Sequence, residues 1–122
     1  MIIVDNKPIF LQIADGLMDR IAGGVYPPGE RLPSVREQAA NNQVSANTVL
    51  RAYEVLERDG IIYNKRGIGF FASPDARERI AQRRKREFNA GEREHFFARL
   101  HQMGVTPETL MEEYQQYLNS RQ

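Results

Sequence analysis

Residues 32–67 contain two closely spaced helix-start signals, which constrain the fold more than any other part of the chain. Ser34 and Glu37 have the spacing of a capping box, in which each side chain accepts a hydrogen bond from the other residue's backbone amide. Ser45 marks a second helix start, shortly after the polar run 41–43 that should end the first helix. Two helices joined by a turn of three or four residues form a helix-turn-helix.

The second helix of this pair has two contrasting faces. Its apolar positions recur at the spacing of a buried stripe and are Val49, Ala52, Tyr53 and Leu56. The opposite face carries Ala46, Asn47, Leu50, Arg51 and Glu54. Because a helix-turn-helix lays its second helix in the DNA major groove, this outer face predicts DNA binding.

A basic hairpin is predicted directly after the second helix. Gly60 suits the left-handed residue that follows a helix. Short strands are predicted over residues 61–63 and 69–72, and residues 30–32 are expected to add a very short third strand. The turn between the two main strands carries Lys65, Arg66 and Gly67. A hairpin with a basic tip is a wing that can reach a phosphate or a narrow minor groove.

A second interpretation of these motifs stays open. A winged helix-turn-helix can also serve as a protein-interaction module that makes no sequence-specific contact with DNA. A gel shift against the chain's own promoter region, with a salt titration, separates the two interpretations.

The remaining patterns predict a mainly α fold with a small β wing (α+β). A first helix is expected with Pro8 as its first helical residue and with apolar side chains one turn apart at Ile9, Ile13, Leu17 and Ile21. The winged helix-turn-helix is expected over residues 1–73, followed by a helical dimerisation tail over residues 74–122. Ser73 and Pro74 have the order of a cap and a first helical residue, which places the start of the tail.

Several motifs in register cover a little over half of the chain. They are YPPGERLPSVRE at 26–37, VSANTV at 44–49, LERDG at 56–60 and RGIGFF at 66–71. On these motifs the segment 8–72 resembles the DNA-binding domain of the GntR family of bacterial transcription regulators. The short tail is similar to that of the YtrA subfamily, whose regulators carry two helices there in place of a large ligand domain.

The motifs and the resemblance together predict a set of residues at DNA. They are Ser34, Arg36, Ser45, Ala46, Asn47, Thr48, Leu50, Arg51, Lys65, Arg66 and Gly67. The resemblance implies that Arg36 reads a base; the alternatives are a phosphate contact or an ion pair with Glu37 or Glu54. Ala46 and Leu50 stand where relatives often have polar or basic readers, so either a thymine methyl contact or a packing role is expected for each.

The tail carries more apolar surface than two short helices can bury against each other. Its apolar residues, expected at a homodimer interface, are Phe96, Phe97, Leu100, Met103, Leu110, Tyr114 and Tyr117. The alternative is that the tail folds back onto the first helix. One helix over residues 75–103 with a soft point at Gly91 is expected, and Thr106 should cap the last helix. The basic run 77–86 either contacts flanking phosphates or forms a solvated helix face.

Composition excludes several functional classes. The chain has 17 basic and 16 acidic residues, so DNA binding needs a local gathering of cations instead of bulk charge. It has no cysteine, and its two histidines, His95 and His101, lie about 240° apart round a helix, so neither a metal site nor a catalytic centre is expected. No cofactor is expected, and no apolar run approaches the roughly 20 residues of a membrane span.

These observations predict a cytoplasmic transcription regulator that binds double-stranded DNA. We expect a repressor that binds a palindromic operator as a homodimer. A small-molecule effector of unknown identity stays open, because the tail is too short for the large sensing domain of other family members.

Overall fold

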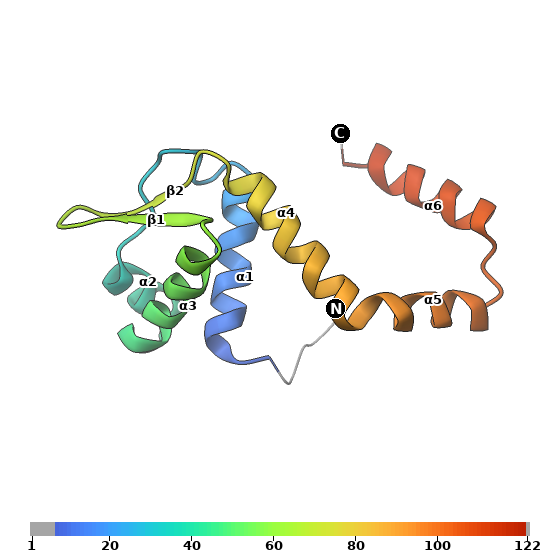
Figure 1. Ribbon diagram of the computed structural model, residues 1–122, viewed down its shortest axis with the longest axis horizontal. Helices are drawn as coiled ribbons and strands as arrows, with labels where there is room; N and C mark the ends of the chain where they lie inside the picture. Colours follow the sequence, from blue (N-terminus) through green and yellow to red (C-terminus); the bar gives the residue numbers. More distant parts are fainter. Residues whose placement is uncertain (1–6, 122) are drawn as a thin grey trace. The chain divides into compact units, whose positions relative to one another are not determined.

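The computed structural model describes residues 7–121 and shows a mainly helical chain with one small antiparallel sheet (Figure 1). The first of two compact units ends at Arg83, and the second begins at Arg84. The first unit contains α1 (Ile9–Ala22), α2 (Val35–Asn42), α3 (Ala46–Arg58), β1 (Ile62–Lys65) and β2 (Gly69–Ala72). The predicted fold class, a winged helix-turn-helix with a helical tail, is confirmed.

Side-chain hydroxyls fix the starts of α2 and α3. Glu37 N–H donates to Ser34 Oγ at 3.1 Å, and Ser34 N–H donates to Glu37 Oε1 at 3.1 Å, which completes the predicted capping box. Thr48 N–H donates to Ser45 Oγ at 3.1 Å, as expected of the second cap. Gln43 ends α2 with a left-handed φ of 55°, so the turn between the two helices is short. Local capping therefore produces the helix-turn-helix.

The helices and the sheet of the first unit share one apolar core. The predicted stripe on α3 is confirmed, since all four of its side chains are buried. On α1 the buried residues are Ala14, Leu17, Met18 and Ile21, whereas Ile9 is 52% exposed. The predicted helix is therefore present, but its first apolar residue lies outside the core. Pro8 is the N-cap of α1 and not its first helical residue, because its ψ of 149° is extended.

The hairpin has the predicted second strand, while β1 starts one residue later than expected. Ile62 pairs with Ala72 and Lys65 with Gly69. Residues 30–32 contribute only one bridge, between Arg31 and Phe71. Leu32 N–H donates to the Phe70 carbonyl at 2.8 Å, which holds this segment against β2.

The next helix, α4 (Ala76–Glu87), begins two residues after the predicted start at Pro74. Ala76 N–H donates to the Ser73 carbonyl at 3.1 Å, so Ser73 and Pro74 form the turn before the helix. Ala76 and Ile80 are buried in the core of the first unit, and Arg83 pairs with Asp59 at the end of α3. These contacts extend the first compact unit beyond the boundary at residue 73 that the sequence suggested.

The second unit begins at Arg84, in the last turn of α4. It contains the π-helical segment η1 (Phe88–Glu92), α5 (Arg93–Gln102) and α6 (Pro107–Asn119). Helical backbone runs without a break from α4 through η1 to α5, and the wider π turn contains Gly91, the predicted soft point. Thr106 Oγ1 accepts from Thr109 N–H at 3.2 Å and caps α6 as expected.

Tyr53 connects three elements of the first unit. Its ring is fully buried on α3, and its hydroxyl donates to the Pro33 carbonyl at 2.5 Å. The ring also meets Phe70 of β2 edge-on, with the centroids 4.9 Å apart. Burial raises the pKa of Tyr53 well above its ordinary value. One side chain thus holds the segment before α2 and the hairpin against α3.

We predict that Tyr53→Phe lowers the free energy of unfolding by about 1–2 kcal/mol at neutral pH, because the Pro33 carbonyl loses its donor. In the unfolded chain the phenol loses its proton near its ordinary pKa of about 10, whereas the folded phenol stays protonated. Stability from this group is therefore complete below about pH 10 and falls as the pH rises further. Urea unfolding at pH 7 and in alkali should show both effects; equal stability and equal alkaline decline for the two proteins would contradict this role of Tyr53.

Candidate DNA interface

The helix starts and the hairpin turn belong to the same compact unit. Figure 1 shows α2 and α3 packed together beside the β1–β2 hairpin, whose turn extends past them. The buried stripe of α3 turns its other face outward, so Ala46, Asn47, Leu50 and Arg51 are exposed. The structure therefore brings together, in one unit, the three elements for which the sequence predicts DNA contact.

Arg36 is exposed in the first turn of α2. Within residues 7–121 it makes no ion pair, so the alternative of a salt bridge with Glu37 or Glu54 is not found there. The Glu37 carboxylate instead accepts the Ser34 amide, and this bond lowers the pKa of the Glu37 carboxyl. The Arg36 guanidinium is available to a ligand.

The start of α3 presents small polar side chains. Ser45 Oγ and Thr48 Oγ1 lie 2.8 Å apart, so the two hydroxyls are bonded to each other as well as to the helix end. Each hydroxyl has one proton and two lone pairs and keeps capacity for a further partner. Asn47 and Leu50 are exposed beside them, and Leu50 is 39% exposed. Packing within the chain therefore covers part of the Leu50 side chain and leaves the rest exposed.

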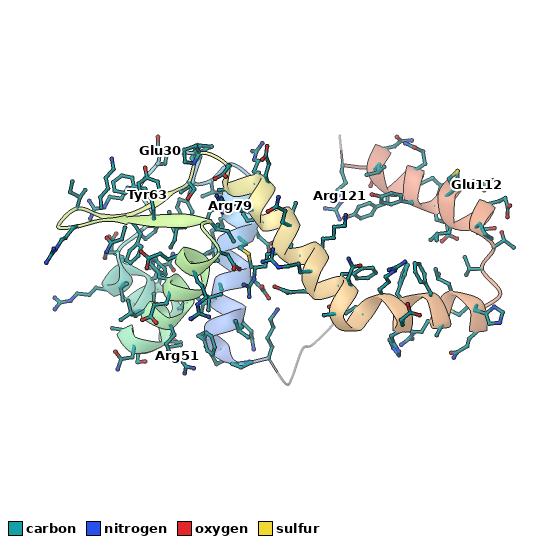
Figure 2. All side chains as sticks on the ribbon, in the orientation of Figure 1. Glu30, Arg51, Tyr63, Arg79, Glu112 and Arg121 are labelled. Atoms are coloured by element: carbon teal, nitrogen blue, oxygen red, sulfur yellow. The ribbon has the colours of Figure 1, made fainter. Side chains whose placement is uncertain are left out.

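Arg51 lies over an aromatic ring that its sequence neighbourhood does not reveal. Its guanidinium carbon is 4.2 Å from the centroid of Phe10 on α1, and Figure 2 shows Arg51 where α3 faces α1. A cation–π contact fixes the direction of a long side chain and leaves its charge unneutralised. No sequence signal at Arg51 identifies Phe10, because the contact depends on the packing of α1 on α3.

The hairpin carries two aromatic rings and a lysine together on its outer face. Alternation along the strands turns Ile62 and Ala72 inward, and it places Tyr63, Lys65 and Phe71 on the opposite face. The rings of Tyr63 and Phe71 stack with centroids 5.8 Å apart, and Lys65 Nζ lies 4.7 Å from the Phe71 centroid (Tyr63 is labelled in Figure 2). Lys65 is thus held by a ring in the same way as Arg51.

The hairpin turn needs a glycine. The turn runs from Lys65 to Ile68 and is closed by a hydrogen bond in which Ile68 N–H donates to the Lys65 carbonyl at 2.8 Å. Gly67 is its third residue and has a left-handed φ of 80°. A Cβ at Gly67 would meet nothing within 4 Å. The turn therefore exposes Arg66 and leaves bare backbone at its tip, where a ligand can approach closely.

Two arginines of the basic run 77–86 on α4 form ion pairs within the chain. Arg79 Nε donates to Asp75 Oδ2 at 2.8 Å, and Arg83 pairs with Asp59. Pairing within the first unit is a role that neither interpretation of this run included. The Arg83–Asp59 pair also attaches α4 to the end of α3.

Neither a metal centre nor a membrane span is found in the described part of the chain. Residues 7–121 contain no group of three or more histidine, cysteine, aspartate or glutamate side chains placed to hold a metal ion. No helix within the same residues is long and apolar enough to cross a membrane.

We predict that Arg51→Ala lowers the free energy of unfolding by about 0.5–1 kcal/mol, the usual value of an exposed cation–π contact. Arg58→Ala is the matched control, because Arg58 is also exposed on α3 but lies over no ring of the described chain. Chemical denaturation of both variants measures the difference. A loss at Arg58 equal to that at Arg51 would show that Phe10 contributes nothing.

Comparison with known proteins agrees with this geometry. The model of the bacterial regulatory proteins of the gntR family matches residues 10–72. An HTH-type transcriptional regulator of Bacillus subtilis, YhcF, is 37% identical over 107 residues, covering 88% of this chain and 87% of that protein. The transcriptional repressor YtrA of the same organism is 39% identical over 77 residues, covering 63% of this chain and 59% of the repressor.

A solved structure is similar over nearly the whole length of the chain. It is a GntR-family regulator from Bacteroides thetaiotaomicron, with 40% sequence identity and a TM-score of 0.74, and the match covers 94% of this chain and 100% of the other. The family match, the relatives and the helix-turn-helix with its wing lead to one assignment. The chain belongs to the GntR family and is a DNA-binding transcription regulator, not an enzyme.

Proposed function

We propose that the chain is a cytoplasmic repressor that binds a palindromic operator as a homodimer. The observation that carries the proposal is the apolar surface of the tail. No residue between Phe88 and Asn119 is buried, and the structure describes all of them. Five of the residues assigned to the interface have between 42% and 64% of their surface exposed, namely Phe96, Phe97, Met103, Tyr114 and Tyr117.

The exposed side chains of the second unit border a groove between α5 and α6. Its volume is about 630 Å³, and its lining residues are Phe88, Phe96, Pro107, Leu110, Met111 and Tyr114. An exposed apolar patch of this kind is typical of a protein interface. A second copy of the chain is the occupant we propose, because twofold dimers are the commonest soluble assembly and each copy offers the same surface. Phe88 and Met111 join the interface that the sequence predicted.

A twofold dimer places two helix-turn-helix units on one duplex. Such units read half-sites about one helical turn apart, so a symmetric protein binds a palindromic sequence. Repression is supported by the similarity to the repressor YtrA. Bound over a promoter, the dimer would exclude the transcription machinery.

Within each half-site we assign different roles to the exposed residues. Arg36 reads a guanine, because its unpaired guanidinium forms a fork that matches O6 and N7. Asn47 contacts an adenine edge, and Ala46 and Leu50 contact thymine methyls. Ser34 at the start of α2, Ser45 and Thr48 at the start of α3, and the wing residues bind the DNA backbone. The wing residues in this role are Lys65, Arg66 and Gly67, together with Arg51 of α3.

The general test uses fluorescence anisotropy with a duplex from the chain's own promoter region and with a scrambled duplex of equal length. A salt titration on each duplex separates the phosphate contribution from base reading. Preference for the promoter duplex at every salt concentration supports the proposal. Equal binding to both duplexes would contradict sequence-specific recognition.

We predict that Arg36→Ala lowers affinity for the promoter duplex by about tenfold or more, since one bidentate base contact contributes roughly 1–3 kcal/mol of discrimination. Binding to the scrambled duplex should change much less. Arg36→Lys is the control, because it keeps the charge and loses the planar fork. Equal losses on both duplexes would assign Arg36 to a phosphate and not to a base.

We also predict that the double variant Phe97→Glu, Leu100→Glu is monomeric. Four charges would enter the interface of the dimer, and apparent DNA affinity should fall by about two to four orders of magnitude once the half-site readers are unlinked. The matched control is Ala98→Glu, Gln102→Glu, which adds the same charge on the other face of α5. Analytical ultracentrifugation measures the mass; a wild-type chain that stays monomeric at tens of micromolar would refute the dimer.

A further inference from the structure

Arg31 lies between two of the elements assigned to DNA contact, although no sequence motif assigns it a role there. It bridges to Phe71 of β2, and three residues later Ser34 caps α2. In Figure 1 this connecting segment passes the hairpin on its way to α2. Because Arg31 pairs with Phe71, its side chain belongs to the same face of the hairpin as Lys65.

The Arg31 side chain lies across the backbone of Gly69. A Cβ added at Gly69 would be 2.9 Å from Arg31 Nε and 3.5 Å from Arg31 Nη2. Gly69 also has a φ of 142°, a conformation that other residues rarely adopt. The missing side chain therefore leaves the space in which the Arg31 guanidinium sits, directly beside the hairpin turn.

The charge of Arg31 is exposed and is not neutralised by a close partner. Arg31 forms no ion pair with another residue of the described chain, from Lys7 to Arg121. Its guanidinium contributes, after the Ser34 bonds, to the lowered pKa of Glu37 at the start of α2. Arg31 is therefore close enough to the α2 start to act on it, while the guanidinium rests on the hairpin.

We propose that Arg31 binds a DNA backbone phosphate between the groove read by Arg36 of α2 and the groove reached by the wing, and that Gly69 is the residue that positions it. A recognition helix enters the major groove, and a wing reaches the adjacent minor groove. A phosphodiester strand separates these two grooves. Arg31 lies between the start of α2, whose Arg36 we assign to the major groove, and the wing, so it is placed to meet that strand. A planar fork of donors on an unpaired arginine suits a phosphate.

The inference rests on the proposed DNA-binding face, so its test includes variants that report on that face separately. Full-length Arg31→Ala, Arg31→Lys, Arg36→Ala and the control Arg58→Ala are titrated with the promoter duplex and the scrambled duplex at several salt concentrations. Arg58→Ala removes the same charge from an exposed position at the far end of α3. Thermal melting confirms that each variant is folded.

Arg31→Ala should weaken binding to both duplexes by a similar factor of about ten, because a phosphate contact carries no sequence information. The slope of log affinity against log salt should fall by about 0.9 for each phosphate that the variant no longer binds. Arg31→Lys should keep most of the slope. If Arg31→Ala instead matches Arg58→Ala while Arg36→Ala loses specificity, the role of Arg31 is wrong and the DNA-binding face stands. If neither Arg31→Ala nor Arg36→Ala changes binding, the proposed face itself is wrong.

The role of Gly69 is tested by a double-mutant cycle. Gly69→Ala should weaken DNA binding in the wild-type background, since the new Cβ displaces the guanidinium. In the Arg31→Ala background the same substitution should have little further effect on binding, because the group that it displaces is gone. Equal losses in both backgrounds would show that Gly69 acts only through the conformation of the hairpin.

Discussion

The buried contact of Tyr53 is the interaction on which the DNA-facing surface depends. Its hydroxyl bonds the Pro33 carbonyl directly before the cap of α2, and its ring packs edge-on against Phe70 of β2. Tyr53 itself belongs to α3, so one rigid side chain holds the segment before α2 and the wing against α3. Base reading requires that several residues contact DNA at the same time. Because Tyr53 fixes the relative positions of the elements that carry these residues, the surface is already arranged before DNA binds.

A second principle is the way in which the cations of this surface are held. Arg51 rests on Phe10, Lys65 rests on Phe71, and Arg31 rests on Gly69. An acidic partner would fix the same side chains but would also cancel the charge that a phosphate needs. Aromatic rings and bare backbone fix the direction and leave the charge. A chain whose basic and acidic residues nearly balance can in this way present a basic surface at one place.

The sequence predicted those parts of the fold that local chemistry determines. The capping box at Ser34, the cap at Ser45 and the buried stripe of α3 each follow from residues within a stretch of eight positions or fewer. The contacts of Arg51 with Phe10 and of Arg31 with Gly69 could not be predicted, because each joins residues distant in the chain and depends on packing. The same reason explains why α4 belongs to the first unit as far as Arg83: its partner, Asp59, lies at the end of α3.

We propose that the starts of α2 and α3 and the wing turn together form one DNA-binding surface. Hydrogen–deuterium exchange of the full chain, with and without a duplex from its own promoter region, tests this claim most directly. We predict slower exchange on DNA binding at residues 34–38, 45–51 and 64–69, with the exchange of α6 unchanged. Slowed exchange confined to the tail, with these three segments unaffected, would contradict it.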